Sequence, residues 1–83
     1  MRPLYFLFTQ PNCVWCDRAK QLLRDHDLDF VTGDISKSTD LRLFVKANEL
    51  TTVPQIYLNG ERIGGFDALY AKLGDANVQL KLL

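Results

Sequence analysis

The sequence predicts an α/β fold in which helices cover both faces of a four-stranded mixed sheet, in the order β-α-β-α-β-β-α. Apolar runs of strand length alternate along the chain with apolar stripes at helical spacing, and Asn59-Gly60 is a strong hairpin signal. The 83 residues, 47% of them hydrophobic, suffice for one modest core. We therefore expect a single domain over residues 1–83.

The only two cysteines lie just after the first predicted strand, at the start of the first predicted helix. Arg2 to Thr9 is dense in aromatic and aliphatic residues, which predicts a strand buried on both faces. Gln10-Pro11-Asn12 predicts a turn, and a helix should then run from Val14 to about His26. The apolar stripe expected on this helix consists of Val14, Ala19, Leu22 and Leu23.

A second strand and a second helix follow. Asp27 to Ile35 predicts a strand that lies parallel to the first, because the helix between them should form a right-handed crossover. Ser36 to Asp40 contains residues typical of a helix start. The apolar stripe expected on this helix consists of Leu41, Phe44, Val45 and Leu50.

The third and fourth strands are predicted to form a hairpin. Val53 to Leu58 is the third strand, and the Asn59-Gly60 turn should return Glu61 to Ile63 antiparallel to it. Gly64-Gly65 should end the fourth strand.

A third helix is predicted to begin near Phe66 or Asp67 and to end at Gly74. A short terminal helix is expected between Asp75 and Leu83. The apolar residues of the third helix are Leu69, Tyr70 and Leu73.

The two cysteines, Cys13 and Cys16, indicate redox chemistry. A C-x-x-C motif next to a βαβ pattern is typical of thiol–disulfide exchange. At the first turn of a helix, unpaired backbone N–H groups and the helix dipole favour a thiolate over a thiol. We expect Cys13 to be exposed and to attack a disulfide sulfur, and Cys16 to lie nearer the core. Either Cys16 or a second small thiol would then resolve the mixed disulfide.

Two other interpretations of the cysteines are weaker. Free cysteines are often buried as small apolar residues, but the position after a strand argues against simple packing. A closed zinc site needs four ligands, and the chain offers two Cys and one His. That histidine, His26, lies about three helical turns beyond Cys16, and we expect it on the surface at a helix end. No metal site is therefore predicted.

Two further positions near the cysteines bear on binding. Trp15 offers a flat aromatic wall for a small thiol substrate, or alternatively is partly buried against a neighbouring loop. Pro54 cannot donate to a sheet, so it belongs at a strand start or on an edge. If the Val53–Pro54 bond is cis, the Val53 backbone points outward and can pair with an extended ligand; a trans bond would only mark the strand start.

The Gly64-Gly65-Phe66-Asp67 segment predicts an anion site. Paired glycines allow positive φ, and the free N–H groups of the following helix suit a carboxylate. Asp67 would hold an ammonium group beside it. The alternative is that Asp67 only caps the helix.

Taken together, these motifs give the chain a family resemblance. Over essentially its full length the chain resembles a small dithiol glutaredoxin of the thioredoxin fold, similar to phage and bacterial members. The resemblance rests on the following segments: Cys13-Val14-Trp15-Cys16 with Ala19-Lys20 and Leu22-Leu23, Thr52-Val53-Pro54-Gln55, and Gly64-Gly65-Phe66-Asp67-Ala68-Leu69.

The resemblance implies glutathione-dependent reduction of protein disulfides and of glutathione mixed disulfides. It implies that Cys13 is the nucleophile, that Cys16 is the resolving thiol and that the Val53–Pro54 peptide is cis. Glutathione would act as a co-substrate, with no tightly bound cofactor. The glutathione-binding residues that it implies are Gln10, Trp15, Thr52, Val53, Pro54, Gly65, Phe66 and Asp67.

Two departures from the family pattern concern the same site. Val14-Trp15 stands where the family commonly has Pro-Tyr, which frees an N–H at the helix start. Gln10 stands where the family often has a lysine, so that position brings a hydrogen bond but no charge. Part of the glutathione affinity is then expected from Lys46 in the second helix. The alternative is that Lys46 only lies on a solvent-exposed face of that helix.

Composition and charge limit the partners. Acidic and basic residues balance at ten each, which gives no basis for binding nucleic acid or an anionic membrane. The longest apolar run, Leu4 to Phe8, is too short to span a bilayer, and the N-terminal segment does not resemble a secretory signal. We expect a cytoplasmic monomer whose partners are glutathione and disulfide-containing proteins, with ribonucleotide reductase as one candidate.

Two other functions remain open at this stage. One is a thioredoxin-like electron donor that a flavoprotein reductase recycles, although the Gly64–Asp67 loop favours glutathione. The other is a binding module in which Cys13 from each of two chains and two glutathiones hold an iron–sulfur cluster.

Overall fold

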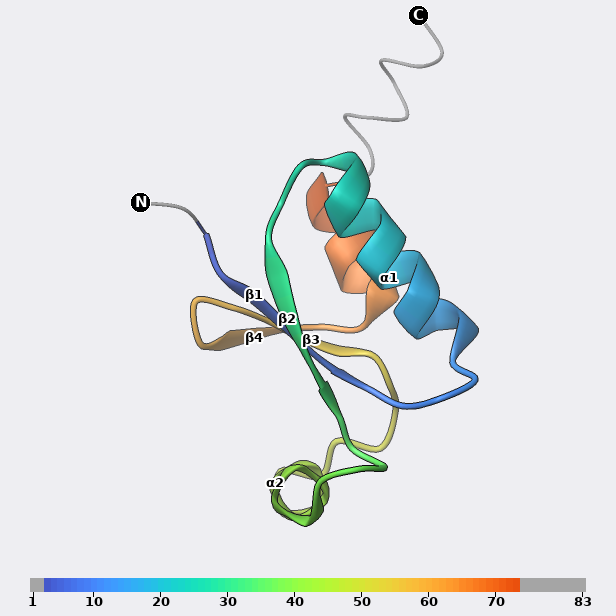
Figure 1. Cartoon of the computed structure of the whole chain (residues 1–83). Coiled ribbons are helices and arrows are strands. Elements are labelled where there is room, and N and C mark those ends of the chain that lie inside the picture. Colours follow the sequence, from blue (N-terminus) through green and yellow to red (C-terminus); the bar gives the residue numbers. More distant parts are fainter. Residues whose placement is uncertain (1–2, 74–83) are drawn as a thin grey trace, which may run out of the picture.

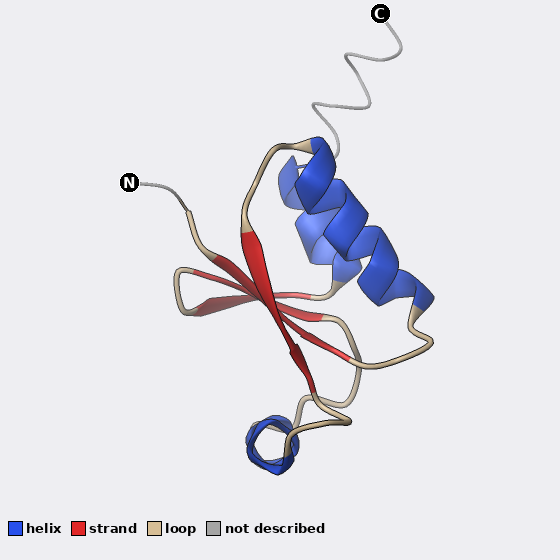
Figure 2. Ribbon diagram, in the orientation of Figure 1, coloured by secondary structure: helices blue, strands red, loops and turns tan. Residues whose placement is uncertain are grey.

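In the computed structural model, which describes residues 3–73, a four-stranded sheet separates helices on its two faces (Figures 1 and 2). Helix α1, Val14–Asp25, and a helix over residues 66–73 lie on one face, and helix α2, Thr39–Ala47, lies on the other. The predicted order of elements and the mixed sheet are confirmed for the described residues.

Strand β1, Tyr5–Thr9, lies in the middle of the sheet, whose order is β2-β1-β3-β4. It pairs in parallel with β2, Phe30–Asp34, and antiparallel with β3, Gln55–Leu58. The hairpin strand β4, Glu61–Gly64, pairs antiparallel with β3, with an irregularity between Ile56 and Tyr57. A central strand is covered on both faces, which explains the near-continuous apolar character of β1.

The core lies between the sheet and the pair of helices formed by α1 and residues 66–73. Side chains that point alternately from a strand reach opposite faces, so Tyr5 and Leu7 enter this core whereas Phe6 and Phe8 face α2. Aliphatic side chains at helical spacing complete it. The buried members of the core cluster are Tyr5, Leu7, Ala19, Leu23, Ile56 and Leu69.

Three of the apolar side chains expected on the predicted helices are exposed. Val14 is 61% exposed because it occupies the first turn of α1, at the cysteine end of the helix. Phe44 is 44% exposed, since one face of its ring stacks on Phe8 at 5.4 Å. Tyr70 is also exposed, with its ring 6.0 Å from that of Phe66.

The ends of several elements differ from the prediction. The first strand begins at Tyr5, because the backbone N–H and C=O of Leu4 bond to Asn59 in the hairpin turn. The second strand begins at Phe30, because Asp27 has φ +56° and ends the preceding turn. The third strand begins at Gln55, so Val53 and Pro54 stay in the loop.

The ends of α2 and of the last helix follow local signals. Ser38 caps α2, since its Oγ accepts a hydrogen bond of 3.2 Å from the Leu41 N–H. Residues 66–73 are helical as predicted. The expected stop at Gly74 and the terminal helix between Asp75 and Leu83 lie outside the described residues.

Membrane insertion was not expected from the sequence. Among residues 3–73, none of the helices combines the length and the apolar character needed to span a membrane.

Replacing Leu69 with alanine should lower the free energy of unfolding by about 2–5 kcal/mol, the usual cost of a cavity at a fully buried leucine. Urea denaturation followed by circular dichroism measures the change. The matched control is Leu43→Ala on α2, where the side chain is 59% exposed and we expect a change within about 0.5 kcal/mol. Equal effects in the two variants would contradict the placement of the core.

Replacing Gly64 with alanine should lower the free energy of unfolding by about 1–3 kcal/mol. Gly64 has φ +124°, and an added Cβ would lie 3.0 Å from the Ala68 Cβ. Gly65→Ala is the control in the same loop, because its Cβ would meet only the Pro54 carbonyl oxygen at 3.5 Å. Urea midpoints that fall further in Gly65→Ala than in Gly64→Ala would refute this account of the turn.

Candidate active site

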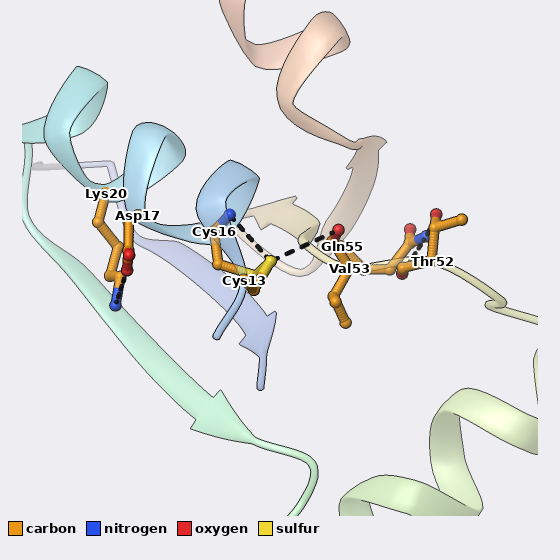
Figure 3. The surroundings of a disulfide bond; sticks show 7 residues. All are labelled: Cys13, Cys16, Asp17, Lys20, Thr52, Val53 and Gln55. Carbon is orange, nitrogen blue, oxygen red and sulfur yellow. Dashed lines mark hydrogen bonds and ion pairs between the residues drawn. A yellow bond between two sulfur atoms is a disulfide. The ribbon is translucent and has the colours of Figure 1, made fainter. Parts of the chain in front are cut away.

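The two cysteines open α1 and are joined by a disulfide (Figure 3). Cys13 is the N-cap residue, with extended backbone at φ −109° and ψ 102°, and its Sγ accepts a hydrogen bond of 3.1 Å from the Cys16 N–H. The preceding turn is closed by Asn12 at φ +59°. A sulfur in this position lies where the helix dipole and free N–H groups stabilise negative charge.

The two sulfurs differ in accessibility. Cys16 is 1% exposed and belongs to the buried residues of α1, whereas Cys13 is only half-buried. The expected asymmetry is therefore present, although Cys13 is more covered than an exposed residue. An external disulfide can approach Cys13, and Cys16 is reached through Cys13.

The loop before β3 covers one side of Cys13. The Sγ of Cys13 lies 3.8 Å from the Val53 carbonyl oxygen, and the Val53–Pro54 peptide is cis, as the resemblance implied (Figure 3). In the reduced protein this carbonyl is an acceptor within reach of a thiol at Cys13. Pro54 is buried and Val53 is partly buried beside it.

Gln55 fixes this loop, which was not predicted from the sequence. Its buried side chain donates through Nε2 to the Thr52 carbonyl oxygen at 3.0 Å and lies 3.2 Å from the Thr52 Oγ1 (Figure 3). Its Oε1 accepts from Arg62 at 3.4 Å. A buried amide satisfied in this way constrains the backbone on either side of Pro54. The sequence signals were a polar residue at the start of an apolar strand and its place in the Thr52–Gln55 motif of the family resemblance.

Seven of the eight residues implied for glutathione line one groove of about 500 Å³. The groove runs from Trp15 and the Val53–Pro54 loop to the start of the helix over residues 66–73. Its lining residues are Trp15, Thr52, Val53, Pro54, Gly65, Phe66, Asp67 and Ala68. Ala68 was not anticipated, because an alanine in the first turn of a helix carries no chemical signal.

The eighth residue, Gln10, lies on the other side of the loop. It lines a neighbouring pocket of about 290 Å³ that shares Thr52 and Val53 with the groove. A ligand bound in the groove therefore meets Gln10 only if it also extends across Thr52 and Val53.

One end of the groove is a helix N-terminus. The helix begins after Gly65, whose carbonyl oxygen accepts the Leu69 N–H at 3.2 Å, so the first N–H groups have no partner within the helix. Asp67 is exposed beside them. The arrangement provides donors for a carboxylate next to an acceptor for an ammonium group.

Trp15 forms a fixed wall of the groove. Its ring is 50% exposed and lies 5.3 Å from the Phe66 ring, centroid to centroid. The guanidinium carbon of Arg18 lies 4.8 Å from the same indole centroid. Trp15 thus lines the groove and is also partly buried against Phe66, so both expected arrangements are present together.

Two residues with ionisable side chains, Lys46 and His26, lie away from the groove. Lys46 is exposed on α2 and lines neither of the two pockets, so the structure does not support its expected contact with glutathione. His26 caps the far end of α1, but it is partly buried rather than fully exposed, and its buried Nε2 has no hydrogen-bond partner. Neither side chain contributes to the groove.

The shifted pKa values concern groups away from the cysteines. Hydrogen bonds from the Ser36 hydroxyl and N–H hold the pKa of Asp34 below its usual range. Burial raises the pKa of Tyr5. Within residues 3–73 there is no group of three or more His, Cys, Asp or Glu side chains placed to hold a metal ion.

The sequence is similar to those of proteins whose family is known. The Glutaredoxin family model matches residues 5–63, more than half of the chain. Glutaredoxin 3 of Escherichia coli K12 is 36% identical over 69 residues, which cover 78% of this chain and 80% of that protein. The hybrid peroxiredoxin hyPrx5 of Haemophilus influenzae is 38% identical over 63 residues, but these cover 76% of this chain and only 26% of hyPrx5.

A solved structure confirms the fold. Glutaredoxin 1 from Francisella tularensis superimposes with a TM-score of 0.74 at 26% identity, covering 93% of this chain and 98% of that one, and the predicted thioredoxin fold is confirmed. Family, fold and the Cys13–Cys16 pair agree with one another. The chain belongs to the glutaredoxin family, and its C-x-x-C pair makes it a thiol–disulfide oxidoreductase.

Proposed function

We propose that the protein reduces glutathione mixed disulfides and protein disulfides with glutathione as its co-substrate. The observation that carries the proposal is the groove that runs from Val53 to the helix N-terminus at Phe66. The Cys13 Sγ lies beside it, 3.8 Å from the Val53 carbonyl oxygen. A tripeptide with a carboxylate at each end and a thiol in the middle matches these three features.

Glutathione would lie extended along the groove. Its cysteinyl backbone would pair with the N–H and C=O of Val53, in the manner of an added strand. The α-carboxylate of its γ-glutamyl residue would accept from the free N–H groups at Phe66 and Asp67, and the ammonium group would meet the Asp67 carboxylate. The glycine carboxylate would point across Thr52 towards Gln10.

The reaction begins at the Cys13 thiolate. The Cys16 N–H, 3.1 Å from the Cys13 Sγ, stabilises the thiolate by a charge-assisted hydrogen bond. The thiolate attacks the glutathione sulfur of a mixed disulfide, which forms a Cys13–glutathione disulfide and releases the substrate thiolate. A second glutathione thiolate then attacks the bound glutathione sulfur, which releases oxidised glutathione and restores the Cys13 thiolate.

A protein disulfide would use both cysteines. Cys13 attacks one sulfur of the substrate and forms a mixed disulfide, while the other substrate sulfur leaves as a thiolate. The thiolate of Cys16 then attacks Cys13, giving the Cys13–Cys16 disulfide and a fully reduced substrate. Glutathione would reduce this disulfide in turn. Ribonucleotide reductase is one candidate substrate of this kind, and we propose that the protein acts as a monomer in the cytoplasm.

The two alternative functions, a thioredoxin-like donor and a cluster-binding module, require different features of the chain. A donor recycled only by a flavoprotein reductase has no use for the groove at Phe66 and Asp67. A cluster-binding module would need two chains and two glutathiones, because each chain presents one accessible cysteine sulfur.

Cys13→Ser should reduce turnover to the uncatalysed background. The assay uses the mixed disulfide of glutathione with mercaptoethanol as substrate, with reduced glutathione, glutathione reductase and NADPH to recycle the product. Rapid NADPH consumption by the wild-type protein supports the proposal, and appreciable turnover by Cys13→Ser would refute Cys13 as the nucleophile. If only thioredoxin reductase sustains activity, the thioredoxin-like alternative replaces the proposal, whereas inactivity with both, together with visible absorbance after anaerobic purification, indicates a cluster.

Cys16→Ser should keep mixed-disulfide turnover within the same order of magnitude while losing the reduction of protein disulfides. The first route needs only Cys13 and an external thiol, whereas the second needs the resolving sulfur of Cys16. Insulin reduction and the mixed-disulfide assay measure the two routes in parallel. Loss of both activities in a folded Cys16→Ser protein would contradict this division.

A further inference from the structure

A cationic side chain, that of Arg18, lies just outside the groove and contacts the Trp15 ring that lines it. Arg18 is exposed on α1, and its guanidinium carbon lies 4.8 Å from the centroid of the Trp15 ring. Trp15 lines the groove, whereas Arg18 does not. A ligand confined to the groove would therefore not reach Arg18, but a chain that continues past Trp15 would.

The helix itself offers Arg18 no acidic partner. Side chains three or four residues away are the neighbours of a residue on a helix surface. None of those four positions carries a carboxylate; they are Val14, Trp15, Gln21 and Leu22.

The nearest acidic residues of α1 are engaged elsewhere. Asp17 pairs with Lys20 at 3.3 Å, on the turn that Figure 3 shows beside the cysteines. Asp25 accepts a hydrogen bond of 2.9 Å from Gln21. Within residues 3–73, Arg18 therefore has the Trp15 ring as its contact and no hydrogen bond or ion pair.

The chemistry of this arrangement favours a carboxylate. A guanidinium that contacts an aromatic ring keeps its N–H donors available, and these donors match a carboxylate in a bidentate geometry. Because Trp15 also contacts Phe66, the ring against which the Arg18 guanidinium packs has a defined position. This reduces the conformational entropy that Arg18 loses when it binds a carboxylate.

We infer that Arg18 recognises an acidic residue next to the reacting cysteine in the protein half of a mixed disulfide. The inference rests on the proposed function and adds a substrate preference to it. When Cys13 attacks the glutathione sulfur, the protein cysteine leaves as a thiolate and its flanking residues lie outside the glutathione groove. An aspartate or glutamate there meets Arg18, which takes no part in the exchange of sulfur atoms.

The test compares two blocked peptides, each carrying glutathione on a central cysteine. One peptide has glutamate on both sides of the cysteine and the other has glutamine. The wild-type protein should show a kcat/KM about twofold to fivefold higher for the acidic peptide, the range that a solvent-exposed ion pair supports. The preference should shrink as salt is added, because exposed charges are screened.

Arg18→Gln should abolish the preference and leave the glutamine peptide unaffected, and Arg18→Glu should reverse it. Arg24→Gln is the matched control, because Arg24 makes the same kind of contact with Phe30, at 5.4 Å, towards the other end of α1. Circular dichroism confirms that each variant is folded. An unchanged preference in Arg18→Gln, or the same loss in Arg24→Gln, would overturn the inference.

Failure of the inference and failure of the proposed function give different results. If the wild-type protein turns over both peptides equally, the glutathione mechanism stands and the role of Arg18 is wrong. If neither peptide nor the mercaptoethanol mixed disulfide is turned over, the proposed function fails and the inference falls with it.

Discussion

The antiparallel pairing of β1 with β3 is the constraint on which the site depends. In this register Phe8 lies opposite Gln55, so the last residues of β1 and the first residues of β3 lie side by side at the same end of the two strands. The chain leaves β1 into the cysteine turn and enters β3 from the cis Val53–Pro54 peptide. Two segments 40 residues apart are thereby held within 3.8 Å, at the Cys13 sulfur and the Val53 carbonyl.

The order of elements was predictable because it follows from local signals. Apolar spacing, the Asn59-Gly60 turn and the Ser38 cap act within a few residues, and the structure uses each of them. Burial was less predictable. Helical spacing indicates which side of a helix faces inward but not how far the covering surface extends, so Val14 and Phe44, which lie on the predicted apolar stripes, are exposed.

The residues of the functional site were likewise predictable only in part. The family resemblance implied the cis peptide and seven of the eight residues that line the groove, because each motif that carries the resemblance is contiguous in the chain. Gln55 and Arg18 were missed because their roles depend on contacts that spacing does not show. Gln55 acts through a buried hydrogen bond to Thr52, and the significance of Arg18 depends on its contact with a tryptophan that Phe66 holds in place.

These differences suggest how chemistry and selectivity are separated in this small protein. The contacts proposed for glutathione use backbone groups of Val53 and of the helix start at Phe66, and most side-chain changes leave backbone groups in place. Arg18, beyond Trp15, is an exposed side chain of α1 and can change without disturbing the sheet or the cysteine turn. A free guanidinium at that boundary is therefore placed to alter which protein presents its disulfide without altering how Cys13 reacts.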